Sequence, residues 1–185
     1  MKKEIIEWIK AIVFALIIVG FINLFVTTTM VYSTSMYPTL IEKDLLILKR
    51  NNMVERGDIV SFVSELEINE SDIDSLNIIQ KLKAKEGDKK SLIKRVIGLP
   101  GDSLLIKDGK VYINGEEYNE GYLSTTTSGD VKIDKIPEDK YFLMGDNRSV
   151  SLDSRSELVG LVDKEVIVGN VIFRIYPFKR IGNVK

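Results

Sequence analysis

The longest uncharged stretch of the chain lies near its start. No charged residue occurs from Ala11 to Ile41, and Ala11–Val26 is apolar apart from Gly20 and Asn23. Extended through the following threonines to Tyr32, the stretch has 22 residues. As a helix it measures about 33 Å, enough to cross a hydrocarbon core of about 30 Å. Its hydrophobicity continues all round rather than in one stripe, which favours a membrane span over a buried core helix.

The flanks of this stretch predict an uncleaved anchor with its N-terminus in the cytoplasm. The segment at its end, residues 26–35, has no A-x-A-like pair of small residues, which disfavours a cleaved export signal. Three lysines precede the stretch, at positions 2, 3 and 10, whereas Lys43 is the first basic residue after it. The positive-inside rule then orients the chain. The predicted organisation is residues 1–10 in the cytoplasm, residues 11–32 in the membrane and residues 33–185 on the outer face.

After this span, short runs rich in Ile, Val, Leu, Phe and Tyr alternate with turn residues, and no segment shows a long 3.6-residue period. This pattern predicts a mainly β domain. Asp108-Gly109 and Asn114-Gly115 are typical hairpin turns. The expected strands are Asp44–Lys49, Asp58–Val63, Leu92–Ile97, Ser103–Lys107, Val111–Ile113, Tyr141–Met144 and Glu165–Tyr176.

Residues 64–91 interrupt the strand pattern. Acidic residues there are mixed with five lysines around one short apolar patch, Leu76–Ile79. A solvated polar excursion or ribbon is favoured over a basic interaction site, because the lysines are balanced by acids.

Composition limits the chemistry that this domain can perform. The chain has no cysteine and no histidine. A disulfide, a thiol nucleophile, a thiolate-bound metal, a Ser-His-Asp triad and a His-rich zinc site are therefore excluded. Acid–base chemistry would have to use Lys, Asp, Glu or Tyr. A formal net charge of −1 gives no electrostatic case for binding nucleic acid.

Two serines are candidates for pairing with Lys94. Ser91 and Lys94 have the S-x-x-K spacing of penicillin-binding proteins and β-lactamases, but that motif works on a helix. On the predicted strand, residues three apart point to opposite faces. The companion S-D-N and K-T-G motifs are also missing. This interpretation is therefore not favoured.

The better candidate is Ser35, which lies just past the span in a hydroxyl-rich segment that Pro38 favours as extended chain. By itself this segment is equally compatible with a juxtamembrane linker. Strand alternation places Lys94 on one face with Leu92 and Val96. Apolar neighbours disfavour the charged amine, lower its pKa and make it a possible general base. The alternative is a lysine that extends to solvent at a strand edge.

A third cluster, Gly145–Arg155, holds two acids, two arginines and three serines in one loop. It suggests a charge-paired scaffold beside a site, although a polar loop that only stabilises itself has the same composition.

Four segments, in order behind the apolar span, resemble the bacterial type I signal peptidases. They are Ser35-Met36-x-Pro38-Thr39, Gly57–Val60, Lys94–Asp102, and Gly145–Arg148 with Ser151-x-Asp153-Ser154-Arg155. The likeness continues to the segment Phe173–Phe178 near the C-terminal end. It implies a β domain of antiparallel strands similar to the signal peptidases and the self-cleaving repressors. Only 42 residues separate Asp102 from Gly145, which is similar to the compact Gram-positive form.

By this resemblance, Ser35 is the nucleophile and Lys94 its general base. The oxyanion hole is formed by the Ser35 backbone N–H and the Ser33 hydroxyl, at a position where many Gram-positive members have glycine. Ser151 hydrogen-bonds the Lys94 amine and orients it. The further implied roles are Asp153 and Arg155 as a supporting ion pair, Asp146 and Arg148 as braces of the same loop, and Met36 and Ile93 as linings of the substrate site.

The resemblance implies a membrane-bound serine endopeptidase that cleaves exported preproteins after small residues at −1 and −3. Its partners are signal-peptide-bearing preproteins and, through the anchor, membrane lipid, in the bacterial cytoplasmic membrane. No cofactor, metal or nucleic acid is implied. Two features depart from the family pattern. Ser149-Val150 stands where an Asp-Asn pair is usual, and residues 64–91 are long for a compact member.

Two alternatives remain open at this point. A self-cleaving repressor domain has a similar fold and similar Ser/Lys chemistry, but it would be preceded by a DNA-binding domain instead of a span. A catalytically silent membrane module would only bind exported peptides.

Overall fold

The computed structural model describes residues 2–50, 53–75, 85–123 and 125–184. Its helices and strands, with 3-10 helices written η, follow in chain order. They are α1 (Lys2–Phe25), β1 (Val26–Met30), η1 (Thr34–Met36), β2 (Leu45–Lys49), β3 (Ile59–Glu67), α2 (Glu70–Ser75), β4 (Lys89–Gly98), β5 (Leu104–Lys107), β6 (Lys110–Ile113), β7 (Glu116–Glu117), β8 (Val131–Ile133), β9 (Lys140–Met144), β10 (Val162–Asp163), η2 (Lys164–Val166), β11 (Ile167–Tyr176), η3 (Phe178–Arg180) and β12 (Gly182–Asn183).

The strands form two antiparallel sheets. The larger has the order β1-β2-β11-β3-β4-β9-β10, with β12 paired to β11, and the smaller has the order β7-β6-β5-β8. Each of the seven strands predicted from the sequence is present, although β3 and β4 extend further than expected, to Glu67 and from Lys89. β11 begins only at Ile167, because Glu165 and Val166 belong to η2. The prediction of a mainly β domain with antiparallel strands and an apolar N-terminal helix is confirmed.

The N-terminal helix ends earlier than the sequence predicted. The apolar stretch was expected to be helical to Tyr32, but α1 ends at Phe25 and Val26–Met30 form β1, paired with β2. Three consecutive threonines in β1 explain the difference, because β-branched residues favour strands and β2 supplies backbone hydrogen bonds. The remaining apolar helix, Lys3–Phe25, has 23 residues and is still long enough by length and composition to cross a membrane.

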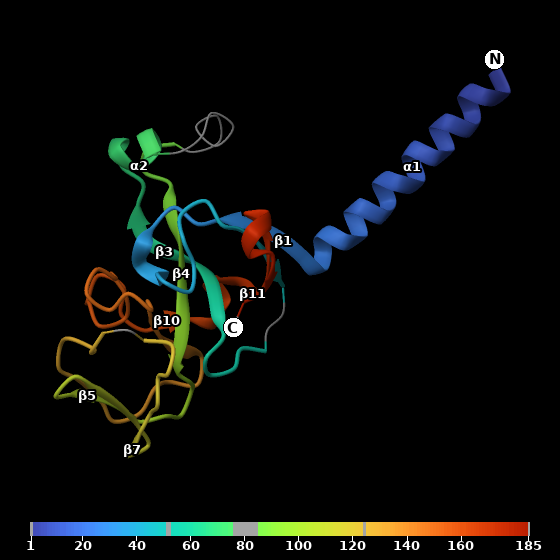
Figure 1. Ribbon diagram of the computed structural model, residues 1–185. Helices are drawn as coiled ribbons and strands as arrows, with labels where there is room; N and C mark the ends of the chain where they lie inside the picture. Colours follow the sequence, from blue (N-terminus) through green and yellow to red (C-terminus); the bar gives the residue numbers. More distant parts are fainter. Residues whose placement is uncertain (1, 51–52, 76–84, 124, 185) are drawn as a thin grey trace.

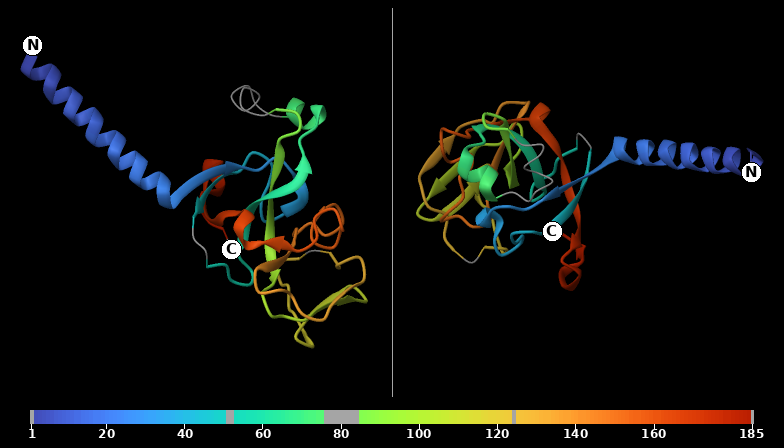
Figure 2. Two further views of the ribbon diagram at one scale, coloured as in Figure 1. Left: turned by 180° about the vertical axis from the view of Figure 1, so that it is seen from behind. Right: turned by 90° about the horizontal axis from the view of Figure 1, so that it is seen from above.

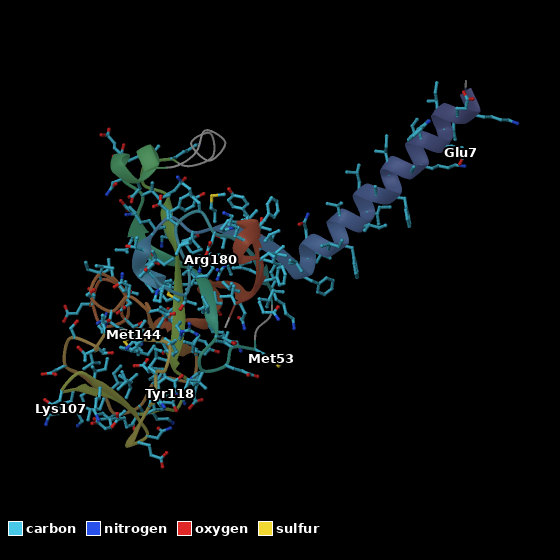
Figure 3. The ribbon with its side chains drawn as sticks, viewed as in Figure 1. Glu7, Met53, Lys107, Tyr118, Met144 and Arg180 are labelled. Atoms are coloured by element: carbon cyan, nitrogen blue, oxygen red, sulfur yellow. The ribbon has the colours of Figure 1, made fainter. Side chains whose placement is uncertain are left out.

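Helix α1 stands away from the β domain in all views (Figure 1; Figure 2). Its apolar side chains are exposed along its whole length, and none of its candidate span is buried in the protein. Figure 3 places Glu7 near the free end of α1 and Lys107 at the opposite end of the molecule. An exposed apolar helix of this length is what the membrane-anchor prediction requires.

Residues 64–91 extend the pair β3 and β4 beyond the body of the domain. The two strands stay paired out to Glu67 and Lys89, and α2 lies at the tip of this ribbon (Figure 1). The ribbon and the small sheet β5–β7 lie at opposite ends of the β domain (Figure 1). The apolar patch Leu76–Ile79 falls outside the described residues.

Strand β4 lies between two parts of the hydrophobic core. Leu92 and Val96, which share one face of the strand, pack in the cluster around Phe62, whereas Ile93 packs against the cluster that contains Met36. Lys94 lies between these residues, on a strand that has apolar contacts on both faces.

Candidate active site

Ser35 is held in a short turn directly after β1. It lies in η1, whose N-cap is Ser33 with extended backbone angles of φ −128° and ψ 153°. The Ser33 hydroxyl accepts a hydrogen bond from the Ser35 backbone N–H at 3.2 Å. On the other side, the Asn147 N–H donates to the Ser35 carbonyl at 2.9 Å. The turn is therefore fixed between its own cap and the loop after β9.

Lys94 reaches Ser35 from the middle of β4. Its Nζ lies 2.8 Å from Ser35 Oγ and also donates to the Ile93 carbonyl at 3.2 Å. Both residues are buried, with Lys94 only 3% exposed and Ser35 8% exposed. The structure thus joins two residues that are 59 positions apart in the sequence.

The protonation of Lys94 is shifted by its surroundings. Burial lowers the pKa of the amine from 10.5 to about 8, although the carboxylates of Asp153 and Asp146 oppose this shift. At neutral pH about a tenth of the molecules then hold a neutral amine with a free lone pair. In that state the 2.8 Å contact lets the Ser35 hydroxyl donate its proton to Lys94, which is the geometry of a general base.

The two donors predicted for an oxyanion hole lie side by side. In this structure the Ser35 N–H donates to the Ser33 hydroxyl oxygen, so this N–H is already hydrogen-bonded. A carbonyl oxygen that entered here would have to replace this contact and accept from both.

Ser151 does not make the hydrogen bond that the family resemblance implied. Its buried hydroxyl lies beside the Asp153 carboxylate but has no well-aligned partner. The Lys94 amine bonds instead to Ser35 and to its neighbouring carbonyl. The expected contact from Ser151 to Lys94 is therefore wrong for this structure.

Asp153 and Arg155 form the predicted pair in the loop after β9. Arg155 donates to both carboxylate oxygens of Asp153, at 2.8 and 2.9 Å, and the Gly145 N–H donates to the same group at 3.0 Å. Burial alone would raise the pKa of Asp153, but the hydrogen bond and charge of Arg155 hold that pKa below its usual value. The carboxylate therefore stays charged and orders the loop beside Ser35.

Asp146 and Arg148 are both buried, but their partners are residues that the sequence reasoning missed. Asp146 accepts two hydrogen bonds from Arg95, at 2.8 and 2.7 Å. Arg148 pairs with Glu120 through both of its terminal nitrogens. Arg95 follows Lys94 on β4, so strand alternation directs its side chain to the opposite face. Glu120 lies in a stretch without any local pattern.

Gly145 is a third residue to which the sequence assigned no role. A Cβ at this position would lie 2.3 Å from Ser151 Oγ and 2.5 Å from the Ser35 carbonyl oxygen. Only a residue without a side chain lets the loop approach Ser35 this closely.

A cleft beside Ser35 is bordered by two strand edges that have no partner among the described residues. β1 pairs only with β2, and the pairing of β4 with β9 begins at Arg95, which leaves Lys89–Lys94 open on that side. Both borders line one cavity of about 130 Å³. Met36 and Ile93, the predicted substrate contacts, both line it. The described part of the chain contains no group of three or more acidic residues placed to hold a metal ion.

Fold and site together define a class of protein: an antiparallel β domain behind an apolar helix, with a serine bonded to a buried lysine beside two open strand edges. The family model described as "Signal peptidase, peptidase S26" matches residues 5–176. This match covers most of the chain, and the chain belongs to that family.

Individual relatives are similar over almost their whole length. Signal peptidase I of Bacillus licheniformis is 36% identical over 197 residues, covering 97% of this chain and 93% of that protein. Signal peptidase IB of Staphylococcus aureus strain COL is 33% identical, covering 96% and 93%. A solved signal peptidase I from Enterococcus faecalis V583 is 27% identical, with a TM-score of 0.48, over 64% of this chain and 96% of that one.

Proposed function

We propose that this protein is a membrane-bound serine endopeptidase that removes signal peptides from exported preproteins. The observation that carries the proposal is the 2.8 Å contact between Ser35 Oγ and the buried Lys94 amine. Membership in the signal peptidase family supports the choice of substrate.

The proposed reaction uses a serine and a lysine. Neutral Lys94 takes the Ser35 proton while Oγ attacks the scissile carbonyl. The Ser35 N–H and the Ser33 hydroxyl then donate to the tetrahedral oxyanion, a contribution of about 3–4 kcal/mol for one donor in well-studied enzymes. Lys94 passes its proton to the leaving amine, and a water activated by Lys94 hydrolyses the acyl-enzyme.

The open strand edges support binding of the substrate as an added β-strand. An extended peptide between β1 and β4 would pair its backbone with both edges and direct alternate side chains to the same side. The side chains at −1 and −3 then enter the cavity of about 130 Å³ that Met36 and Ile93 line. A cavity of this size favours the small residues expected there.

The anchor completes the proposal. α1 spans the bacterial cytoplasmic membrane with its N-terminal end on the cytoplasmic side, as the flanking lysines favour, and the β domain lies on the outer face. Lipid contacts α1, and the tether raises the effective concentration of the site where preproteins emerge. The chain thus covers an anchor and one catalytic domain.

The test is processing of a purified preprotein by the full-length protein in detergent or vesicles. Ser35→Ala and Lys94→Ala should each reduce cleavage by at least about 10³-fold, because each removes a reacting group. Lys132→Ala, a lysine 74% exposed in its side chain, is the matched control and should cleave as the wild type does.

Circular dichroism and thermal unfolding show whether each variant remains folded. Cleavage by folded Lys94→Ala at the wild-type rate would rule out the proposed base. A wild-type protein that binds preprotein without cleaving it would favour the silent peptide-binding module.

A further inference from the structure

A second hollow opens from the same site toward the ribbon formed by β3 and β4. It measures about 450 Å³, and Ser35 and Lys94 line it together with the ribbon. We call it the ribbon groove, and its apolar walls are Leu66, Ile68, Val150 and Leu152.

The ribbon groove brings together the two features that departed from the family pattern. Leu66 and Ile68 belong to the long segment 64–91, and Val150 replaces one residue of the usual Asp-Asn pair. Val150 is 59% exposed and Leu152 is 39% exposed. Exposed apolar side chains on facing walls gain free energy when another apolar group covers them.

Strand alternation relates the groove to the substrate. On β4, Ser91, Leu92 and Lys94 line both hollows, whereas Ile93 lines only the smaller cavity and Lys89 and Lys90 line only the ribbon groove. A substrate strand laid in the cleft directs neighbouring side chains to opposite sides. With −1 and −3 in the smaller cavity, −2 and −4 point away from it, which leaves the ribbon groove as the hollow that they can enter.

The direction of the bound substrate excludes the residue after the cleaved bond, +1, as the main occupant of the ribbon groove. The smaller cavity runs from Ser35 and Lys94 back to Thr29 and Ser91. Since −1 and −3 share that cavity, the residues before the scissile bond run the same way. The ribbon groove continues in this direction as far as Lys89.

The charged side chains at the ribbon groove already form ion pairs with each other. The ligand that fits the groove is therefore apolar. Lys89 pairs with Glu65, and Lys90 pairs with Asp72 at 2.6 Å. The two lysines therefore offer little attraction to an acidic side chain, and the apolar walls remain.

We propose that the ribbon groove binds large apolar side chains at the −2 and −4 positions of the substrate. This inference rests on the proposed function and adds a second specificity site to it. The geometry assigns small residues to one side of the bound strand and large apolar residues to the other.

The test compares two peptide substrates that differ only in having alanine or leucine at both −2 and −4. The full-length wild type in detergent should cleave the leucine peptide with a kcat/KM about tenfold higher, as expected for partial burial of two leucine side chains. A third peptide with leucine at +1 alone should show no such advantage.

Variants of the groove walls test whether the preference for leucine arises in the ribbon groove. Val150→Ser and the double variant with Leu66→Ser should lower the leucine-to-alanine ratio of kcat/KM to about two or less. The single variant changes a mostly exposed side chain and keeps the fold testable if the double variant does not fold. Leu158→Ser, which replaces a leucine 66% exposed outside both hollows, should keep the wild-type ratio.

The outcomes separate the two proposals. Cleavage of both peptides at equal rates, an unchanged ratio in folded Val150→Ser, or an advantage only for leucine at +1 overturns the ribbon groove and leaves the peptidase proposal standing. Cleavage of none of the peptides by the wild type overturns both.

Discussion

Lys94 is subject to opposing influences. Burial among apolar residues favours the neutral amine, while Asp153 and Asp146 favour the charged one. A pKa of about 8 lets the amine accept a proton from Ser35 and then give it to a leaving group near neutral pH. A lysine exposed to solvent would be almost entirely protonated under the same conditions.

Ser33 offers a prediction about the oxyanion. Ser33→Ala removes one proposed donor and should lower kcat by about 10²–10³-fold with little change in KM, because the interaction forms only in the transition state. Steady-state cleavage of a peptide substrate measures kcat and KM separately. Ser33→Thr keeps the hydroxyl and should retain most of the activity. A rise in KM without loss of kcat in Ser33→Ala would instead indicate a role in substrate binding.

At the scale of elements, the site depends on three segments meeting: the turn after β1, strand β4 and the loop after β9. The loop is held by three buried ion pairs, which are Asp146 with Arg95, Arg148 with Glu120 and Asp153 with Arg155. Gly145 allows the loop to pack directly on the Ser35 carbonyl. Alignment of the serine with the lysine therefore depends on the loop as much as on the strand.

Gly145→Ala tests this packing. The added methyl would overlap the Ser35 carbonyl oxygen at 2.5 Å, so the turn or the loop must shift. Activity should fall by at least about 10²-fold, because small displacements of reacting groups cost that much. The free energy of unfolding should fall by about 1–3 kcal/mol. Gly121→Ala, where a Cβ meets nothing within 4 Å, is the control for both measurements.

The same elements show which parts could be predicted from sequence. The alternation around Lys94 predicted its strand but left open whether the side chain is buried or extends to solvent, and the turn residues were sufficient to locate the hairpins. The end of α1 was not predictable, because a hydropathy pattern does not distinguish a strand of threonines from the last turns of a helix. The partners of Asp146 and Arg148 were not predictable either, since they lie 51 and 28 positions away among 27 acidic and 26 basic residues.

At the scale of the whole molecule, α1 and the β domain are separate in space but connected through β1, which leads straight to Ser35. The proposed site is therefore only a few residues from the proposed anchor. Such a connection keeps the cleft close to the membrane surface, where a tethered site meets its substrate at high effective concentration.

The buried lysine is expected to reduce the stability of the whole domain. Below about pH 8 both folded and unfolded chains hold the Lys94 proton, and the folded state bears the full cost of a buried charge. Lys94→Met should therefore raise the free energy of unfolding by about 1–3 kcal/mol at pH 7 while abolishing cleavage.

The difference in the free energy of unfolding between Lys94→Met and the wild type should change with pH in one direction. Between pH 8 and pH 10.5 the folded chain has released a proton that the unfolded chain keeps, so wild-type stability rises with pH. The gap between Lys94→Met and the wild type should narrow across this range in denaturant unfolding. A variant less stable than the wild type at pH 7 would contradict the assigned cost.

The most direct test of the central claim is the pH dependence of acylation at Ser35. Mass spectrometry of the full-length protein with a β-lactam-type acylating reagent gives both the modified residue and the rate. We expect the adduct on Ser35, with a rate that rises about tenfold per pH unit below pH 8 and levels off above it, as neutral Lys94 accumulates. An adduct on another residue, or a rate on Ser35 that is constant from pH 6 to 9, would contradict the account.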